Sequence, residues 1–414
     1  MRYYDIVIVG AGASGLMAGI CAARIGKNVL ILERLSKPGK KITVTGNGKC
    51  NILSSLEDIR NSVNSSDKDL ACKIFKSIPF QTLKKFFESI GIFVLEKNGY
   101  YYPISLQAST VRDTLVTVAL AEGCDIVCDC EVNDIVKNGS GFIVNKMFSC
   151  DKLIISAGGM SRADLGTDGS SFKLLKMLGI NSTPLYPALV GLTVDFKQSK
   201  TVDGVRHYAD VYLLVDNQEV FNEHGEIVFT KKGIGGIPVM NCSTTAARAI
   251  EAGKNVSLRV AVLTQQDREK MLKSIWERLI EKKYTIEELL TGLANRKLVY
   301  AIMLLHHIDP MLKPGVDEGL KIATEVIDTL CGLTLKVTGT QGFDNSQVTS
   351  GGVKLDEVII GSFEHKKIND LYITGECLDA DFACGGNNLT FAWITGIRAG
   401  TYAAGGTIDS DIFY

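Results

Sequence analysis

Three glycines near the start of the chain, Gly10, Gly12 and Gly15, have the spacing of a turn that binds a pyrophosphate. Gly10 permits a tight turn, and Gly12 leaves the backbone open to a phosphate group. Gly15 allows a following helix to pack close to the preceding strand. Ala13 and Ser14 lie in the same turn, where the free N–H groups at a helix start favour anions. These residues predict a phosphate-binding turn.

The elements needed to position this turn are present on both sides of it. Residues 5–9 are an apolar run typical of a buried strand, and residues 16–25 are compatible with a helix. A second apolar strand at 29–32 ends at Glu33. Together they form the fingerprint of a site for an adenine dinucleotide, with the Glu33 carboxylate on the ribose hydroxyls. Because a 2′-phosphate would be repelled by Glu33, we expect NAD or FAD rather than NADP.

Composition limits the class of protein and its partners. The 414 residues are 46% hydrophobic and 22% charged, which is typical of a soluble globular protein of two or three domains. The net charge of −1 shows no basic surplus, so we expect no nucleic-acid partner. Residues 6–23 carry no charge, but their glycines make a poor membrane span, so we expect no membrane partner. Eleven scattered cysteines suit a reducing cytoplasm, and Cys124, Cys128 and Cys130 lack zinc-site spacing, so no metal is expected.

The order of the patterns predicts an α/β fold with a discontinuous Rossmann domain. Residues 1–186 and 345–414 are expected to build one parallel sheet with its helices. Residues 187–344 are expected to be an insertion that begins with antiparallel strands and is helical at about 265–331. We expect the insertion to supply the substrate-side wall of a cleft. Residues 69–91 have the pattern of one amphipathic helix.

Two further strand ends favour FAD over NAD. Small residues follow one strand at 156–159, and Gly375 and Glu376 follow another. Because the carboxyl ends of parallel strands meet at one edge of the sheet, a longer ligand would cross both. Glu376 is suited to the hydroxyls of a ribityl chain. The glycines at 385–386 precede the last helix, whose positive end would stabilise negative charge on a reduced flavin.

With these motifs the chain resembles the YhiN-like and BaiN-like flavoproteins, a family that includes aminoacetone oxidases and a proposed reductase of a bile-acid pathway. The resemblance covers nearly the whole chain and rests on residues 39–51, 165–169, 225–230, 348–353 and 371–393. It implies FAD bound by a glutathione-reductase-type Rossmann domain. It also implies that the insertion is barrel-like in its β part and helical in the remainder.

The resemblance implies a set of cofactor-binding residues. It places 10–15 on the pyrophosphate and Glu33 on the adenosine ribose. The other residues that it implies follow the FAD molecule and are Arg34, Lys41, Gly48, Cys50 and Asn51 along the binding loop, Val132 at the adenine, Ala157 and Gly158 at the adenosine half, Gly375 and Glu376 at the ribityl phosphate, and Gly386, Asn387, Asn388 and Leu389 under the isoalloxazine. The family usually has Arg at the position of Lys49 and Tyr at that of Asn387, so its substrate specificity is not carried over.

We therefore predict an FAD-dependent oxidoreductase that transfers hydride between flavin and a small organic substrate or NAD(P)H. Because 187–344 holds no second dinucleotide fingerprint, reduced nicotinamide would be a transient electron donor. Two alternatives remain open: an aminoacetone-type amine oxidase that produces peroxide, and a non-catalytic flavin-binding sensor. The catalytic acid or base is not identified. The candidates are His207, His224, His306, His307, Asp379 and Asp381, although a packing, surface or turn-capping role is the simpler interpretation of each. The tyrosines at 100–102 are interpreted as packing residues.

Overall fold

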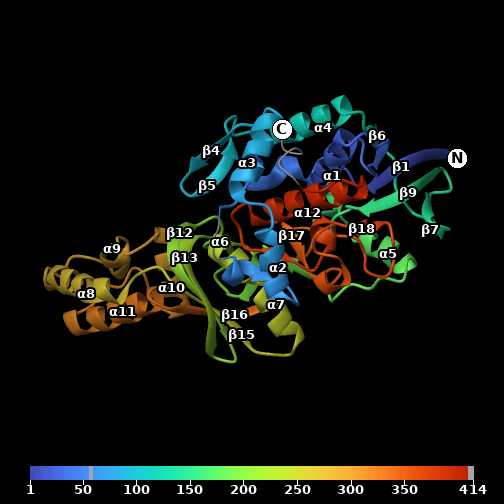
Figure 1. The fold of residues 1–414 in the computed structure, drawn as a ribbon. Helices are drawn as coiled ribbons and strands as arrows, with labels where there is room; N and C mark the ends of the chain where they lie inside the picture. Colours follow the sequence, from blue (N-terminus) through green and yellow to red (C-terminus); the bar gives the residue numbers. More distant parts are fainter. Residues whose placement is uncertain (56–58, 409–414) are drawn as a thin grey trace. The chain divides into compact units, whose positions relative to one another are not determined.

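The computed structural model describes residues 1–55 and 59–408, which form two compact units. The first unit contains residues 1–188 and the chain from 346 onward, and the second contains residues 189–345. Figure 1 shows both units, coloured along the sequence. Each unit has its own hydrophobic core, so each is described separately.

In the described part of the first unit, seven strands form one sheet in the order β6-β2-β1-β9-β8-β7, with β18 paired to the carboxyl half of β9. The strands β6, β2, β1, β9 and β18 are parallel, whereas β7 and β8 are antiparallel additions. The strands of this sheet are β1 Arg2–Val9, β2 Val29–Leu32, β6 Asp125–Val127, β7 Ile135–Asn138, β8 Gly141–Val144, β9 Phe148–Ile155 and β18 Leu371–Ile373.

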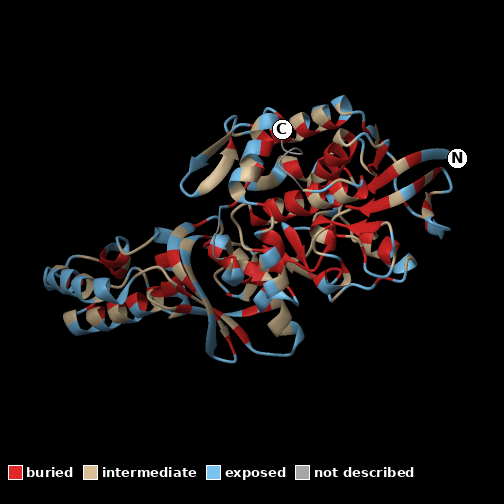
Figure 2. Cartoon of the chain, viewed as in Figure 1, coloured by how far each residue is buried: buried red, intermediate tan, exposed pale blue. Residues whose placement is uncertain are grey.

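Register brings the carboxyl ends of the parallel strands to one edge. Val9 pairs with Leu32 on one side and with Ile155 on the other, and Ile155 also pairs with Ile373. All four residues of β2 are buried, as expected for a parallel sheet covered on both faces. Figure 2 shows this buried centre in red. Val127 at the end of β6 pairs with Leu32, so the sheet presents five strand ends, and the loops that follow them, along the same edge.

Six helices and five short 3₁₀ segments complete the described part of the first unit. The helices are α1 Ala13–Arg24, α2 Lys68–Phe75, α3 Phe80–Ser89, α4 Ala108–Ala121, α5 Ser170–Met177 and α12 Asn387–Ala403. The 3₁₀ segments are η1 Ile42–Gly48, η2 Arg60–Ser62, η3 Ala163–Leu165, η4 Leu355–Glu357 and η5 Gly375–Cys377. Helix α12 is buried along most of its length and packs directly on α1.

The single helix expected over 69–91 is wrong, because α2 and α3 are separate. Pro79 lies at the N-cap of α3 with extended backbone angles. Proline lacks an N–H and disfavours helical angles in the residue before it, so the chain turns at 76–79. Small two-stranded ribbons account for the remaining strands of this unit: β3 Val63–Asn64 with β19 Asp381–Phe382, β4 Val94–Lys97 with β5 Tyr100–Pro103, and β10 Tyr186–Ala188 with β17 Val348–Ser350.

The second unit is built on a closed antiparallel barrel in the order β11-β14-β13-β12-β15-β16. Its strands are β11 Leu192–Asp195, β12 Arg206–Val215, β13 Gln218–Thr230, β14 Gly233–Gly236, β15 Val256–Ala261 and β16 Leu333–Thr340. Its helices are α6 Ile237–Asn241, α7 Ser243–Glu251, α8 Gln265–Ile280, α9 Ile286–Leu290, α10 Arg296–Leu305 and α11 Val316–Leu330. The α/β fold class with a barrel-like and helical insertion is confirmed. Within the described ranges, no helix is both long and apolar enough to cross a bilayer.

Candidate cofactor site

The turn between β1 and α1 has space for an anion at one glycine and none at the other two. Gly10 has a φ of +101°, and a Cβ there would lie 2.6 Å from the carbonyl oxygen of Ser156. A Cβ on Gly15 would lie 1.9 Å from the carbonyl oxygen of Gly10. In contrast, a Cβ on Gly12 would meet nothing within 4 Å. The first turn of α1 has neither an acidic residue nor a side-chain cap, so this open space suits a phosphate group.

Glu33 lies at the end of β2, and its carboxylate is held by backbone donors. One oxygen accepts the N–H of Ala11 at 3.0 Å, and the other accepts the N–H of Leu35 at 2.9 Å. Burial raises the pKa of Glu33, and the two N–H donors partly offset this effect. Because a carboxylate oxygen has more than one lone pair, both oxygens can still accept ribose hydroxyls.

Arg34 connects the end of β2 to two other segments. Its guanidinium lies 2.7 Å from the carboxylate of Asp168 and 3.1 Å from that of Glu131. Burial alone would raise the pKa of Asp168, but hydrogen bonds from Arg34 and Ser170 outweigh it and lower the pKa to about 2. Val132, expected beside the adenine, is buried next to Glu131. The structure therefore places Arg34 and Val132 at the same end of the site as Glu33.

Lys41 and Glu376 join the loop after β2 to the loop after β18. The Lys41 ammonium lies 2.8 Å from one Glu376 oxygen, and the other oxygen accepts the N–H of Thr349 at 2.8 Å. Gly375 has a φ of +60°, and a Cβ there would lie 2.6 Å from the hydroxyl of Ser14. The expected ribityl-phosphate residues therefore lie directly against the pyrophosphate turn.

Thr349 organises the loop after β9, a role that the sequence interpretation missed. Its hydroxyl oxygen accepts the N–H of Met160 at 2.7 Å and that of Ser161 at 3.1 Å. Ser161 and Thr349 are almost completely buried. The available signal was that Thr349 falls within the motif at 348–353. Ala157 and Gly158 precede this anchored loop, and a Cβ on Gly158 would lie 2.5 Å from the Thr167 side chain.

The loop carrying Cys50 and Asn51 lies against the start of α12. Gly386 has a φ of +83°, and a Cβ there would lie 2.9 Å from the Asn51 backbone oxygen. Cys50 is buried, and burial raises its pKa to about 12, so its thiol is protonated at neutral pH. This argues for a packing role for Cys50. Gly48 is exposed, and a Cβ there would meet nothing within 4 Å.

The side chains at the start of α12 hold the preceding loop. Asn388 accepts the N–H of Phe382 at 3.0 Å and donates to its carbonyl at 2.7 Å. The amide nitrogen of Asn387 donates to the carbonyl of Ala383 at 2.9 Å, while its buried Oδ1 has no partner among the described residues. Leu389 is half-buried. Because the Asn388 side chain is hydrogen-bonded to Phe382, we expect backbone N–H groups to contact a cofactor here.

The starts of α1 and α12 are offset along two parallel helices. A Cβ on Gly396 would lie 2.4 Å from the backbone oxygen of Ser14, and one on Gly400 would lie 2.1 Å from that of Ala18. Equal steps of four residues show that the helices run in the same direction. Gly396 lies beside Ser14, so α12 extends further in the N-terminal direction than α1 does. At the rise of an α-helix, the start of α12 at Asn387 lies about 12 Å from the level at which α1 starts. This offset fits a ligand with a pyrophosphate and a second electron-rich group separated by a ribityl chain.

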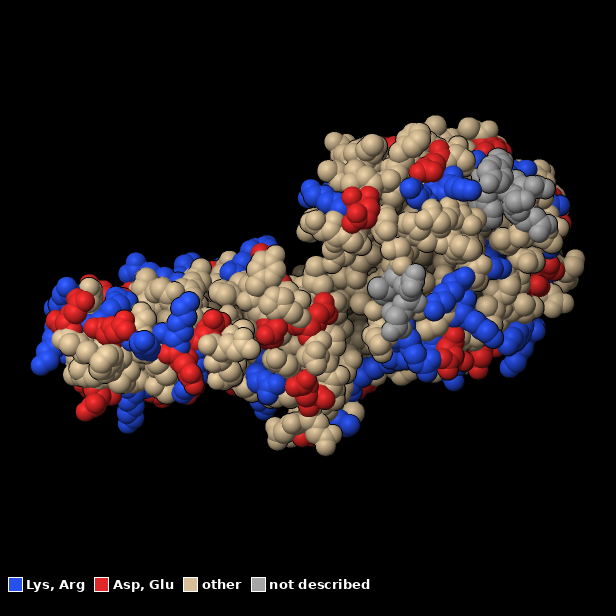
Figure 3. Space-filling model, turned by 60° about the vertical axis from the view of Figure 1, so that its left-hand side comes forward, with Lys and Arg blue, Asp and Glu red and all other residues tan. Residues whose placement is uncertain are grey.

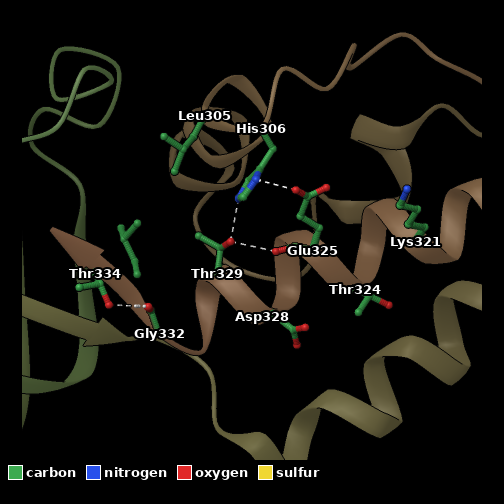
Figure 4. Close-up of a pocket in the computed structure, with 10 residues that line it drawn as sticks. Leu305, His306, Lys321, Thr324, Glu325, Asp328, Thr329, Gly332 and Thr334 are labelled. Atoms are coloured by element: carbon green, nitrogen blue, oxygen red, sulfur yellow. Dashed lines mark hydrogen bonds and ion pairs between the residues drawn. The ribbon is translucent and has the colours of Figure 1, made fainter.

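The other candidate acids and bases are engaged elsewhere. Asp379 and Asp381 are buried, with Asp379 accepting the N–H of Ser66 and Asp381 the amide of Asn64, each at 3.0 Å. His306 belongs to the second unit, where it lines a surface hollow of about 670 Å³ (Figure 4). Its ring nitrogens lie 2.8 Å from the Glu325 carboxylate and 2.8 Å from the Thr329 hydroxyl. His306 is thus hydrogen-bonded to Glu325 and Thr329 within the second unit.

The fold and this edge of the sheet define a Rossmann-type FAD-binding oxidoreductase. The chain matches the family described as HI0933-like protein Rossmann domain over residues 4–402, and it belongs to that family. The predicted recognition of the family and of an FAD-dependent redox enzyme is thereby confirmed. The contacts between individual residues and FAD stay predictions.

Three known proteins are similar to the chain along most of its length. The 3-dehydro-bile acid delta(4,6)-reductase of Clostridium scindens is 35% identical over 410 residues, which are 96% of this chain and 98% of that protein. The ribosomal RNA dihydrouridine synthase of Escherichia coli is 26% identical over 408 residues, covering 95% and 96%. An open-conformation flavocytochrome c3 fumarate reductase has a TM-score of 0.50 at 16% identity, covering 99% of this chain and 79% of that one. This last likeness concerns the fold alone.

Proposed function

We propose that the protein reduces a carbon–carbon double bond conjugated to a carbonyl group in a small cyclic substrate. The observation that carries this proposal is the likeness, over almost the whole length of both chains, to a bile acid delta(4,6)-reductase. In a 3-dehydro steroid acid, double bonds at positions 4 and 6 are conjugated to the ring ketone. The reducible double bond of uridine, the substrate type named for the E. coli relative, is also conjugated to a ring carbonyl. The activities named for these two relatives thus concern the same class of bond, a carbon–carbon double bond conjugated to a ring carbonyl.

The described residues are suited to hold FAD for this reaction. When bound, FAD supplies hydride in its reduced form. Gly12 and the start of α1 would hold the pyrophosphate, and Glu33 the adenosine ribose. The start of α12 would stabilise negative charge on the ring through its dipole and free N–H groups. Nothing in the first turn of α12 opposes this, because that turn has no acidic residue.

The electron donor that we propose is NAD(P)H bound transiently. Apart from the turn at Gly12, the sequence has no dinucleotide fingerprint in which a second cofactor would reside. A donor that binds, reduces the flavin and leaves needs no permanent site. We place the reaction in the cytoplasm, because the eleven cysteines are scattered along the sequence and do not form the pattern of a disulfide framework.

Reduction of uridine in ribosomal RNA is the second candidate, favoured by the full-length likeness to the E. coli relative. Charge argues against it. The chain has 45 basic and 46 acidic residues, whereas RNA-binding proteins present a basic surplus to the phosphates. On the face drawn in Figure 3, acidic side chains lie among the basic ones. We therefore favour the small substrate, and keep the RNA as one arm of the test.

The test uses the FAD-loaded protein without oxygen. The flavin is first reduced with NADH or NADPH, and then mixed with a conjugated steroid ketone, with ribosomal RNA or with buffer. We expect rapid return of the oxidised flavin spectrum with the ketone and formation of its dihydro product. Reoxidation by RNA alone would select the second candidate. In a separate sample that contains oxygen, peroxide formation from aminoacetone would select the amine oxidase. A flavin that no donor reduces would select the sensor.

A further inference from the structure

Two tyrosines of β5 share one face of a hairpin. Tyr100 and Tyr102 are two residues apart on a strand, so their side chains leave the strand on the same side. Their rings are 6.5 Å apart. Tyr101 points to the opposite side, where its ring lies 4.6 Å from that of Phe80. The sequence interpretation of all three as packing residues therefore suits Tyr101 but leaves the other two to be explained.

Backbone hydrogen bonds fasten this strand to the expected cofactor loop. The carbonyl of Tyr101 accepts the N–H of Ile52 at 2.8 Å, and the N–H of Tyr101 donates to the Asn51 side chain at 3.3 Å. Trp393 of α12 donates its indole N–H to the Ile52 carbonyl at 2.8 Å. The hairpin, the loop at 50–52 and α12 are thus one connected assembly. The position of the tyrosine face is fixed relative to the site.

The two rings lie close to glycines of two segments that are expected to contact FAD. A Cβ on Gly385, just before α12, would lie 3.8 Å from the ring of Tyr100. A Cβ on Gly46, in η1, would lie 3.8 Å from the ring of Tyr102. Gly385 directly precedes Gly386, which the family resemblance places under the isoalloxazine, and Gly46 lies two residues before Gly48, which it places along the FAD-binding loop. Tyr100 and Tyr102 therefore border the place where a flat substrate would meet that ring.

The hydroxyl group of Tyr102 is available for chemistry. Its side chain is half-buried, and no partner for its hydroxyl exists among the residues that the structure describes. Burial raises the pKa of Tyr102 above its ordinary value, so the phenol carries its proton at neutral pH. The Tyr102 hydroxyl can therefore donate a proton without breaking a hydrogen bond to a described residue.

We infer that Tyr102 is the proton donor for the reduced substrate and that the Tyr100 ring positions the substrate beside it. This inference rests on the proposed function. Once the β carbon of the conjugated system has gained hydride, the electrons of the broken π bond reside on the carbonyl oxygen as an enolate. The O–H bond of Tyr102 then breaks, its proton adds to the α carbon, and the carbonyl is restored. Water returns the proton to the phenolate, and the reductant is reduced FAD renewed by NAD(P)H.

The first part of the test measures placement without turnover. Apoprotein is nitrated at tyrosine with and without FAD, and the modified residues are mapped by mass spectrometry. We expect FAD to protect Tyr100 and Tyr102. Tyr208, which is 66% exposed in the second unit, is the internal control and should stay reactive. Equal nitration of Tyr100 and Tyr102 in both samples would overturn their placement beside the flavin.

The second part measures the proton transfer in single-turnover reactions. Tyr102→Phe should bind FAD and be reduced by NAD(P)H as the unmodified protein is, but its reoxidation by the conjugated ketone should be about 10²-fold slower or more. Tyr101→Phe is the matched control on the opposite face of the strand and should react normally. Unchanged reoxidation in Tyr102→Phe would overturn the donor role while the proposed function stands. Failure of the unmodified protein to reduce any conjugated substrate would overturn both.

Discussion

The ammonium group of Lys41 lies 2.8 Å from a carboxylate oxygen of Glu376, a residue 335 positions later in the chain. Both side chains are mostly buried. We expect Lys41→Met and Glu376→Gln each to lower the free energy of unfolding, and the double variant to lose less than the sum. The coupling energy should be about 1 kcal/mol, the upper part of the range for exposed pairs.

The surface pair Lys84–Glu88 on α3 offers a matched control, since its atoms are 3.7 Å apart and one helical turn separates them. Its coupling energy should be about 0.3–0.5 kcal/mol. Denaturant unfolding of both cycles makes the comparison. Equal coupling in the two pairs would show that the link between the loops after β2 and β18 has no special energetic weight.

Asp168 should contribute to stability in mild acid. Its pKa of about 2 means that the carboxylate stays ionised in the folded state at pH values where the unfolded chain takes up a proton. This stabilisation is present above about pH 3.9 and is lost as the pH falls toward 2. Because a third of the Asp168 side chain is exposed, the effect should be about 0.5–1 kcal/mol.

The measurement is the urea midpoint as a function of pH for the unmodified protein and for Asp168→Asn. The difference between the two proteins should shrink as the pH falls below about 3.9. Asp164→Asn is the comparison, because a hydrogen bond from Arg162 also lowers the pKa of Asp164 but its side chain is far more exposed, so its difference should shrink in the same direction by less. A constant difference between Asp168→Asn and the unmodified protein at all pH values would contradict the assignment.

His365 should make the protein less stable on moderate acidification. Its ring is buried, and Nδ1 accepts the N–H groups of Ile368 at 3.1 Å and Lys367 at 3.3 Å. Burial lowers the pKa of His365, although the nearby Glu357 opposes this. The unfolded chain therefore binds the proton more readily, so stability is lost as the pH falls below about 6.5.

His365→Asn retains an oxygen that can accept the same N–H groups but does not titrate in this range. Its unfolding free energy should change less than that of the unmodified protein between pH values above and below about 6.5. Thermal unfolding in matched buffers is the measurement. An identical pH dependence in both proteins would assign the acid sensitivity to other groups.

Gly12→Ala should weaken FAD binding without unfolding the protein. The added methyl group meets nothing within 4 Å, so the apoprotein should keep its melting temperature. The same methyl group would occupy the space for a phosphate, and FAD affinity should fall by about tenfold or more, equivalent to about 1.4 kcal/mol. Gly361→Ala in the same unit also adds a methyl group to open space and is the control. Equal FAD affinity in both variants would contradict the phosphate position.

Local patterns predicted the fold class and one end of the site. The spacing of Gly10, Gly12 and Gly15 acts within a single turn, so the sequence alone indicates its geometry. The anchoring of the loop after β9 by Thr349 was not predictable, because it joins hydroxyl and N–H groups almost 190 residues apart. The break at Pro79 could have been predicted from the proline. The sequence also shows that Tyr100 and Tyr102 lie on one side of the strand and Tyr101 on the other. Only the structure shows that the first two rings lie close to Gly385 and Gly46.

The central claim is that FAD lies across the strand ends, with its pyrophosphate on the turn at Gly12. The most direct measurement is the visible spectrum of the purified protein, followed by titration of the apoprotein with FAD. We predict a yellow protein that retains FAD in equimolar amount, or an apoprotein that takes it up to the same ratio. A colourless protein whose apo form gives no flavin spectrum after FAD is added and unbound ligand is removed would contradict the account.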